Sequence, residues 1–167
     1  IGDVKFENCK FTDNVSTELG GAIVNDEKMI ISDCEFEDNS SGGVGGAIAA
    51  TFASDLEIEN TKFKSNKVSS DIDCPGNILP DEAQGFGGAI YNNGRLSIEN
   101  SEFLANCCDE NGGAMIVLPD SKIKISNCLF SENNAKKDGG VMHTMGEIEI
   151  DGSEFKNNNA GESAGVF

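Results

Sequence analysis

The sequence predicts an all-β fold, a right-handed parallel β-helix of about six coils with three short strands in each coil. Three observations lead to this prediction. A repeat of nearly constant length runs along the chain, apolar and polar residues alternate inside each repeat, and turn-forming residues separate the alternating segments. Such units bury their apolar faces by stacking on one another. We therefore treat residues 1–167 as a single β-helix segment, and expect it to be part of a longer solenoid.

The repeat is marked by phenylalanine and asparagine. Six phenylalanines lie 25, 27, 40, 27 and 25 residues apart, and an asparagine follows each of them three residues later. The phenylalanines are Phe11, Phe36, Phe63, Phe103, Phe130 and Phe155, and the asparagines are Asn14, Asn39, Asn66, Asn106, Asn133 and Asn158. Stacked coils place equivalent residues about 4.8 Å apart. We therefore expect one internal column of phenyl rings and one ladder of side-chain amides, each donating to the next coil and accepting from the one before.

The first strand of each coil lies just before the phenylalanine. The residues seven and five positions before it are apolar, as in Leu56 and Ile58, and this period of two predicts a half-buried strand. The alternation then slips three residues before the phenylalanine, at residues that tolerate a left-handed turn. These turn residues are Asn8, Asp33, Asn60, Asn100, Asn127 and Gly152, and we expect their side chains to form a second ladder.

The second strand carries the phenylalanine itself. The residue two positions before it is small and shares its inward direction, so we expect it to fill space in the core. These small residues are Cys9, Cys34, Thr61, Ser101, Cys128 and Ser153. Because parallel crossover connections are almost always right-handed, the coils should wind in that direction.

The third strand follows a pair of glycines, which lets the chain turn where a Cβ atom would clash. The motifs are GGAI at 20–23, 45–48 and 87–90, GGAM at 112–115 and GGVM at 139–142. We expect a second internal column made of Ile23, Ile48, Ile90, Met115 and Met142. By alternation, the preceding alanines should face outward and, together with Val24, Ala49, Tyr91 and Ile116, form a flat apolar strip that contacts a partner. The residues assigned to this contact are Ala22, Ala47, Ala89, Tyr91 and Ala114.

A loop over residues 67–86 interrupts the repeat, and loops of this length are often functional. Cys74 lies in this loop, while Cys107 and Cys108 occupy the equivalent site one coil later. A disulfide between Cys74 and one of these two would close a long loop, and the choice between them stays open. Cys9, Cys34 and Cys128 are expected to be core fillers, although Cys9 and Cys34 lie on adjacent coils where a disulfide is geometrically feasible.

The formal net charge is −17, which excludes nucleic acids and anionic membrane surfaces as partners. No apolar run reaches the roughly 18 residues of a membrane span, so this segment should not insert into a membrane. Basic and acidic residues alternate between neighbouring coils, as in Lys10 and Glu35, Lys62 and Glu102, or Glu37 and Lys64, which predicts surface ion pairs.

No cofactor is expected, with Ca²⁺ as the alternative. Glu57, Glu59, Glu99 and Asp151 should point outward, but the sequence has no EF-hand loop, and Ca²⁺ needs six to eight oxygen ligands. A solvated acidic face is therefore the preferred interpretation.

The pairing of GGAI with FxxN resembles a known family. The FxxN motifs are FTDN, FEDN, FKSN, FLAN, FSEN and FKNN. Together with the glycine motifs they resemble the repeats of the chlamydial polymorphic membrane proteins and of related adhesin-like surface proteins, over the whole chain. The resemblance implies an extracellular or cell-surface solenoid that acts as an adhesin or as a structural building block. Its partner would be another protein, a second copy, or a host or cell-surface ligand.

The alternative is a β-helix of the pectin-lyase type that binds or cleaves a polysaccharide. Hydrolases of this kind need two carboxylates at a defined separation, and the many acidic residues of this chain single out no such pair. Arg95 is the only arginine, and His143, the only histidine, has no evident catalytic partner. The negative charge would also repel an acidic polymer. We therefore assign no catalytic residues and predict that the chain is not an enzyme.

Overall fold

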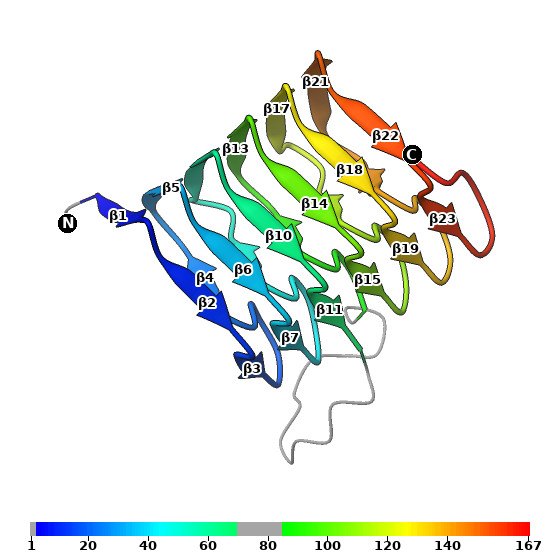
Figure 1. The fold of residues 1–167 in the computed structure, drawn as a ribbon, viewed down its shortest axis with the longest axis horizontal. Coiled ribbons are helices and arrows are strands. Elements are labelled where there is room, and N and C mark those ends of the chain that lie inside the picture. The colour runs from blue at the N-terminus through cyan, green and yellow to red at the C-terminus, as the bar shows by residue number, and fades with distance from the viewer. Residues whose placement is uncertain (1–2, 70–84) are drawn as a thin grey trace.

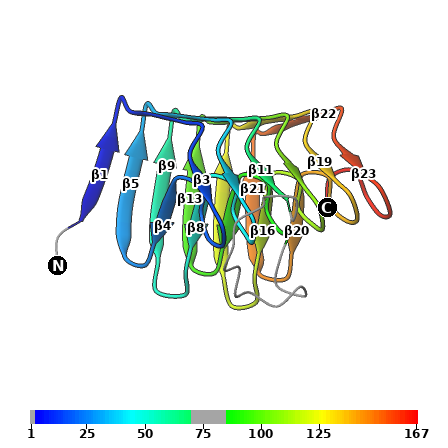
Figure 2. The same cartoon turned by 90° about the horizontal axis from the view of Figure 1, so that it is seen from below.

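The computed structural model describes residues 3–69 and 85–167, which form a parallel β-helix of about five turns without helices (Figure 1). Equivalent strands of successive coils lie side by side along the long axis of the molecule (Figure 2). They build four parallel sheets, which we name A to D in the order in which the chain enters them. The predicted solenoid is confirmed, and every coil except the last has four strands, one more than predicted.

The four sheets contain the following strands. Sheet A consists of β1 (Val4–Glu7), β5 (Lys28–Ser32), β9 (Asp55–Glu59), β13 (Arg95–Glu99), β17 (Lys122–Ser126) and β21 (Glu147–Asp151). Sheet B consists of β2 (Lys10–Thr12), β6 (Glu35–Glu37), β10 (Lys62–Lys64), β14 (Glu102–Leu104), β18 (Leu129–Ser131) and β22 (Glu154–Lys156). Sheet C consists of β3 (Val15–Ser16), β7 (Ser40–Ser41), β11 (Lys67–Val68), β15 (Cys107–Cys108), β19 (Asn134–Ala135) and β23 (Asn159–Ala160). Sheet D consists of β4 (Ile23–Asn25), β8 (Ile48–Ala50), β12 (Ile90–Asn92), β16 (Met115–Val117) and β20 (Met142–Thr144).

The core is built from stacked columns of identical or similar side chains. Rings of the six repeat phenylalanines are stacked with centroids 4.5 to 5.1 Å apart and interplanar angles of 6 to 12°. Phe36, Phe63, Phe103 and Phe130 are fully buried, while Phe11 and Phe155 in the outer coils are partly buried. The Ile and Met side chains that begin the strands of sheet D form the second column predicted from the sequence.

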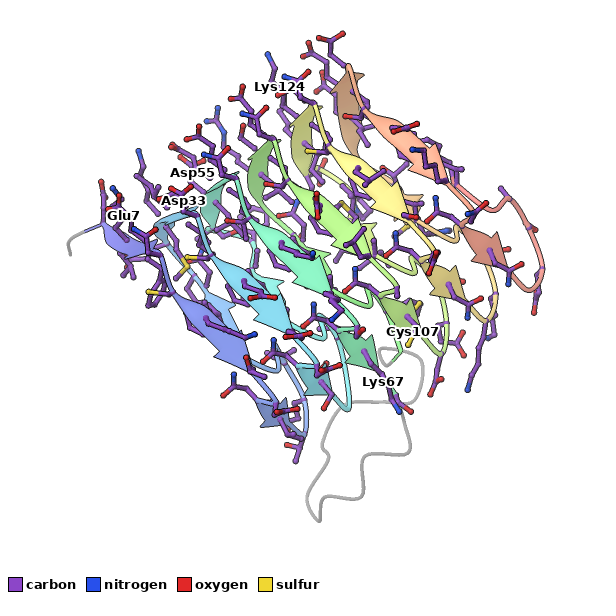
Figure 3. The ribbon with its side chains drawn as sticks, viewed as in Figure 1. Glu7, Asp33, Asp55, Lys67, Cys107 and Lys124 are labelled. Atoms are coloured by element: carbon purple, nitrogen blue, oxygen red, sulfur yellow. The ribbon has the colours of Figure 1, made fainter. Side chains whose placement is uncertain are left out.

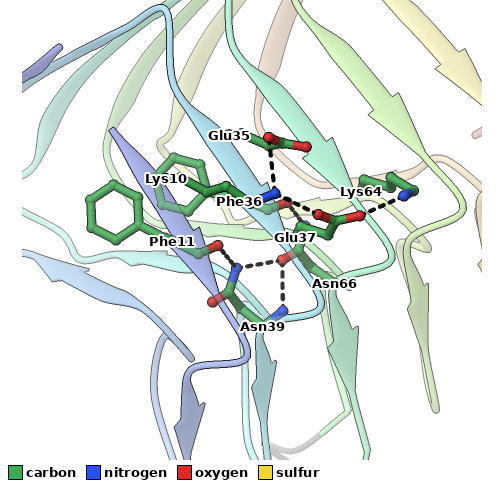
Figure 4. Close-up of polar contacts among 8 residues, drawn as sticks. All are labelled: Lys10, Phe11, Glu35, Phe36, Glu37, Asn39, Lys64 and Asn66. Carbon is green, nitrogen blue, oxygen red and sulfur yellow. Dashed lines mark hydrogen bonds and ion pairs between the residues drawn. The ribbon is translucent and has the colours of Figure 1, made fainter. Parts of the chain in front are cut away.

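The asparagines after the phenylalanines form the predicted ladder (Figure 4). Each Nδ2 donates to the Oδ1 of the next coil at 2.8 to 3.0 Å. The same Oδ1 also accepts the main-chain N–H of the preceding asparagine in the ladder at 2.9 to 3.1 Å. The second hydrogen of each Nδ2 is donated to the carbonyl oxygen of the phenylalanine one coil earlier. The amides of the four central coils are thus buried and fully hydrogen-bonded.

The corner between sheets A and B differs in one respect from the prediction. The turn residues have the left-handed backbone expected of them, with φ of 54° at Asn8 and 48° at Asn60. Their side chains are exposed, however, and no hydrogen bond links them to one another among the described residues. The predicted second ladder at this position is therefore wrong. A left-handed residue at a tight corner directs its side chain into solvent, away from the stacking axis.

A second ladder does exist, one residue further along the chain. The main-chain N–H of Thr61 donates to Ser101 Oγ at 3.1 Å, and that of Cys34 donates to Thr61 Oγ1 at 3.3 Å. Each of these hydroxyl or thiol groups in turn donates to the carbonyl oxygen two residues earlier. The positions read as inert core fillers therefore carry hydrogen bonds between coils.

The glycine pairs form the corner between sheets C and D. Gly87 has a φ of 70°, and a Cβ atom on Gly88 would lie 2.1 Å from the carbonyl oxygen of Gly113. The two residues that follow each glycine pair share one acceptor. In the coil of Gly45 and Gly46, for example, the N–H groups of Ala47 and Ile48 both donate to Ala89 O, at 2.9 and 3.0 Å. The alanine therefore belongs to the corner, and the strand begins only at the isoleucine.

This corner overturns the predicted outward strip of alanines. Ala47, Ala89 and Ala114 are completely buried in the main core cluster, and Ala22 in an outer coil is partly buried against it. The alternation was extended one residue before the true start of the strand, so the alanines were assigned to the wrong face.

The inserted loop is shorter than the predicted 67–86. Lys67–Val68 is strand β11, which pairs with β7 and β15 in register. At the other end, the N–H of Gly85 donates to Gly43 O at 2.7 Å, and Phe86 forms a bridge with Val44. The coil is thus intact on both sides of residues 70–84, which lie outside the described residues together with Cys74.

Candidate functional site

The outer face of sheet A is the main candidate for a functional surface. A shallow groove of about 560 Å³ crosses it, over strands β5 to β21. Alternation along each strand decides which side chains reach the groove: Leu56 and Ile58 enter the core, whereas Asp55, Glu57 and Glu59 point outward. Figure 3 shows the charged side chains that project from this sheet, with Asp55 and Lys124 labelled. The polar side chains lining the groove are Asp55, Glu57, Glu59, Arg95, Ser97, Glu99, Lys122, Lys124, Glu147 and Glu149.

Ser97 lies in the groove between two longer side chains. Ser97 pairs in register with Glu57 on one side and with Lys124 on the other. A short serine side chain between two long charged ones leaves a hollow, because the Cβ atoms of all three residues stand at the same height above the sheet. The parallel register therefore places the small polar side chain of Ser97 between an acidic side chain, Glu57, and a basic one, Lys124.

Charges in the groove are ordered by strand. Strand β9 presents three carboxylates and β17 presents two lysines, which form ion pairs across to β21: Lys122 with Glu147 at 3.1 Å and Lys124 with Glu149 at 3.9 Å. Arg95 differs from these lysines because it has no carboxylate within 4.0 Å among the described residues. It lies in register with Lys122 on one side and with Asp55 on the other. The groove thus contains an exposed, unpaired guanidinium, a group that can bind an anion.

Sheet B carries the ion pairs predicted from the alternating signs (Figure 4). Lys10 lies 3.3 Å from Glu35, and Lys62 lies 3.5 Å from Glu102. Glu37 is held between two coils, by Lys64 on one side and by Lys10 at 2.9 Å on the other. Hydrogen bonds from Lys64 and Lys10 lower the pKa of Glu37 to about 2. These charges are engaged with one another and fix the register of the coils.

Little remains of the predicted apolar strip on sheet D. Val24 is 46% exposed and Tyr91 is half-buried, but Ala49 and Ile116 are buried although they alternate with core residues. Burial raises the pKa of the Tyr91 hydroxyl. His143, on the same outer column, is partly exposed. The exposed part of this face is therefore small, and the assignment of the four alanines to a partner contact has lost its basis.

The cysteines of the predicted loop disulfide are only partly accounted for. Cys107 and Cys108 carry free thiols, and Cys74 is outside the described residues, so a disulfide between them stays a prediction. Cys108 is buried in a small cluster with Val68 and Ala135, and burial raises its pKa to about 12. Burial also raises the pKa of Cys107, which lies beside Lys67 on the neighbouring coil (Figure 3).

Neither a metal site nor a membrane span is found in the part of the chain that the structure describes. Glu59 and Glu99 are neighbours in register, yet no group of three or more His, Cys, Asp or Glu side chains is placed to hold a metal ion in residues 3–69 and 85–167. In the same residues, no helix has the length and apolar character required to cross a membrane.

The sequence carries one signal for the groove, in the outward residues of three neighbouring strands. Along β9, β13 and β17 the outward residues change from acidic to mixed to basic, with Ser97 at the centre. Each strand alone looks like an ordinary solvated strand face. Only the register of three neighbouring coils turns them into one surface.

Comparison with known proteins agrees with the geometry. The chain is 31% identical, over 96 residues, to a protein named probable outer membrane protein pmp12 from Chlamydia pneumoniae. This match covers 51% of the chain but only 18% of the relative, so the chain spans less than a fifth of that protein's length. No solved structure matches the chain significantly. A family described as "Right handed beta helix region" matches residues 2–166. With nearly every residue covered by that match and a continuous parallel solenoid in the structure, the chain belongs to the right-handed β-helix family.

Proposed function

We propose that this chain is a non-catalytic solenoid of an extracellular or cell-surface protein, where it acts as an adhesin or as a building block of a surface assembly. Its membership of the β-helix family and its distant similarity to a protein named as an outer membrane protein support a surface location. Both also fit a role without catalysis, because the name of that relative describes a location and not a reaction.

The observation that carries the proposal is the groove on sheet A. Inside the central coils, the asparagine amides and the small residues such as Thr61 and Ser101 are hydrogen-bonded to one another in the two ladders. On sheet B, Glu37, Lys10 and Lys64 neutralise one another. Within residues 3–69 and 85–167, sheet A combines a hollow of about 560 Å³ with an Arg95 that makes no ion pair. We assign the partner contact to this face in place of the buried alanines.

Reversing the charge of the basic side of the groove tests this assignment. The variant carries Arg95→Glu, Lys122→Glu and Lys124→Glu, and its matched control carries Lys62→Glu, Lys67→Glu and Lys156→Glu, which changes the net charge equally on sheets B and C. Binding of labelled protein to intact cells is measured by flow cytometry, and self-association by sedimentation. We expect the sheet A variant to lose the interaction seen for the wild type, and the control to keep it. Equal loss in both variants, with both folded, would place the contact elsewhere.

Location is tested separately. Antibodies raised against the folded chain are applied to intact and to permeabilised cells of the source organism. We expect equal labelling of both, because the antigen is outside the permeability barrier. Labelling only after permeabilisation contradicts a surface role.

A second candidate function is polysaccharide binding or cleavage in the same groove. The observation in its favour is that the groove holds Arg95 together with carboxylates, since Asp55 is in register with Arg95 and Glu99 lies four residues further along the same strand. A guanidinium can bind a sugar carboxylate, and a carboxylate can act as a general base. Incubation with neutral and acidic polysaccharides, followed by assay for new reducing ends and for unsaturated products, separates the two functions. Product formation that disappears in Glu99→Gln would refute the non-catalytic proposal.

A further inference from the structure

Cys9 and Cys34 occupy equivalent places on the first two coils. The N–H of Glu35 donates to Cys9 O at 2.9 Å, so the two cysteines stand in parallel register, about 4.8 Å apart at the Cα atoms by ordinary sheet spacing. Disulfides in proteins span Cα separations of about 4.4 to 6.8 Å. Register alone therefore places this pair within reach of a covalent bond.

The sulfur of Cys34 already points at its neighbour. Cys34 Sγ accepts the main-chain N–H of Cys9 at 3.4 Å, in the ladder that runs through the small residues at this corner. Both thiols are reduced in this structure and donate to main-chain carbonyls, Cys9 to Glu7 O at 3.3 Å and Cys34 to Ser32 O at 3.1 Å. Since Cys34 Sγ lies against the backbone of Cys9, a bond between the sulfurs requires the Cys9 thiol to leave its hydrogen bond with Glu7 O.

Sulfur is not required for the ladder itself. The same position holds Thr61, Ser101 and Ser153 in other coils, and their hydroxyl groups make the equivalent bonds. Cys128 also stands in this ladder, between Ser101 and Ser153, and has no cysteine beside it in the stack. Only the first two coils place two thiols next to each other at this position, among the described residues.

We propose that Cys9 and Cys34 form a disulfide that staples the first two coils together when the protein meets a disulfide oxidant such as glutathione disulfide. The partly exposed Cys9 thiol loses its proton and attacks the oxidant, which gives a mixed disulfide and one glutathione thiolate. Cys34 then loses its proton and attacks the Cys9 sulfur, which releases the second glutathione. Two thiols are oxidised to one disulfide and one glutathione disulfide is reduced to two glutathiones. This cross-link does not depend on the proposed partner or on catalysis.

Peptide mapping tests the proposal directly. The folded chain is incubated with glutathione disulfide at neutral pH, alkylated and digested with trypsin. Cleavage after lysine or arginine places Cys9 in peptide 6–10 and Cys34 in peptide 29–62, while Cys74, Cys107 and Cys108, and Cys128 fall in three other peptides. We expect 6–10 linked to 29–62 as the main disulfide product containing Cys9. Unlinked Cys9, a persistent mixed disulfide, or Cys9 linked to another peptide would overturn the proposal.

Thermal unfolding of the oxidised protein supplies a second readout. We expect oxidation to raise the unfolding temperature of the wild type by several degrees, and dithiothreitol to remove the increase, because the cross-link restricts the unfolded chain. In Cys9→Ser and Cys34→Ser the ladder bond is kept but oxidation should have no such effect, whereas Cys128→Ser should respond like the wild type. An increase that survives in Cys9→Ser would mean that another cysteine pair is responsible.

Discussion

A single asparagine of the asparagine ladder uses all the hydrogen-bonding groups of its side chain. The side chain of Asn66 donates to Asn106 Oδ1 and Phe36 O, and its own Oδ1 accepts two N–H groups from Asn39. The residue is fully buried, so water cannot replace any of these partners. Its importance therefore lies in the groups it satisfies on two neighbouring coils.

We predict that Asn66→Ala lowers the free energy of unfolding by about 1–3 kcal/mol, because it leaves buried main-chain and amide groups unpaired. Urea unfolding followed by circular dichroism measures the change. Asn60→Gly is the matched control: Asn60 is exposed and has a left-handed backbone that glycine adopts without strain, so the control should unfold like the wild type. Equal stability of Asn66→Ala and the wild type would contradict the ladder.

The phenylalanine column gives a second prediction at this scale. Phe103 is completely buried between the rings of Phe63 and Phe130, with centroids at 4.8 and 4.9 Å. Phe103→Ala should cost about 3–5 kcal/mol, because it removes a large apolar side chain and leaves a cavity inside a rigid stack. Phe52→Ala, at a residue that is 77% exposed, should cost little. Comparable urea midpoints for the two variants would be inconsistent with the column.

At the scale of strands, ion pairs join β2, β6 and β10. Glu37 on β6 binds Lys64 on β10 and Lys10 on β2, and these contacts lower its pKa from 4.5 to about 2. A carboxylate with a lowered pKa contributes stability that is fully present above its unfolded value of about 4.5, and loses it as pH falls toward 2. Because the carboxylate faces solvent and salt screens it, the effect should be modest.

The corresponding test compares the wild type with Glu37→Gln across pH. We expect the wild type to be the more stable protein at pH 6 to 7, and the difference between the two to shrink as pH is lowered from about 5 toward 2. Thermal unfolding at a series of pH values and low ionic strength measures this difference. A difference that stays constant down to pH 2 argues that Glu37 acts by packing and not by charge.

Which elements were predictable depended on the length of their pattern. The five-residue strands of sheet A could be predicted because apolar and polar residues alternate along them, as around Leu56 and Ile58. The two-residue strands of sheet C are too short to have a period, and one of them, Lys67–Val68, falls inside the predicted loop 67–86. The prediction for the alanines is wrong for a different reason: Ala47 shares its acceptor with Ile48 and belongs to the corner, so the alternation of the strand does not apply to it.

The two ladders and the groove also differ in how well the sequence predicts them. An asparagine repeated at a fixed place indicates its amide ladder, since few other roles need that side chain. Cys34, Thr61 and Ser101 share only a small polar group, which the sequence does not distinguish from simple filling of space. The groove around Ser97 could not be predicted from one strand, because it exists only between neighbours.

The whole molecule should behave as a row of exchangeable coils. Deleting residues 104–130 joins Phe103 to Ser131 and keeps one FxxN motif, so the next coil can stack directly on the preceding one. We predict a folded solenoid that is shorter by one coil, or about 4.8 Å. Circular dichroism and small-angle scattering measure the fold and the length. Deleting residues 104–117, which removes only part of a coil, should abolish the cooperative transition. If both deletions behave alike, the coil is not the unit of stability.

The asparagine ladder gives this rod a direction. Each amide in it donates one hydrogen to the oxygen of the following amide, and its own oxygen accepts from the preceding amide. Turning over a single amide would set oxygen against oxygen on one side and N–H against N–H on the other, so the sense chosen by one coil is imposed on all the others. In the language of polymer chemistry the solenoid is a head-to-tail chain whose monomer is the coil. A gene that duplicates one coil in frame therefore adds a monomer that can join in one orientation only, and the rod can lengthen without a new junction having to evolve.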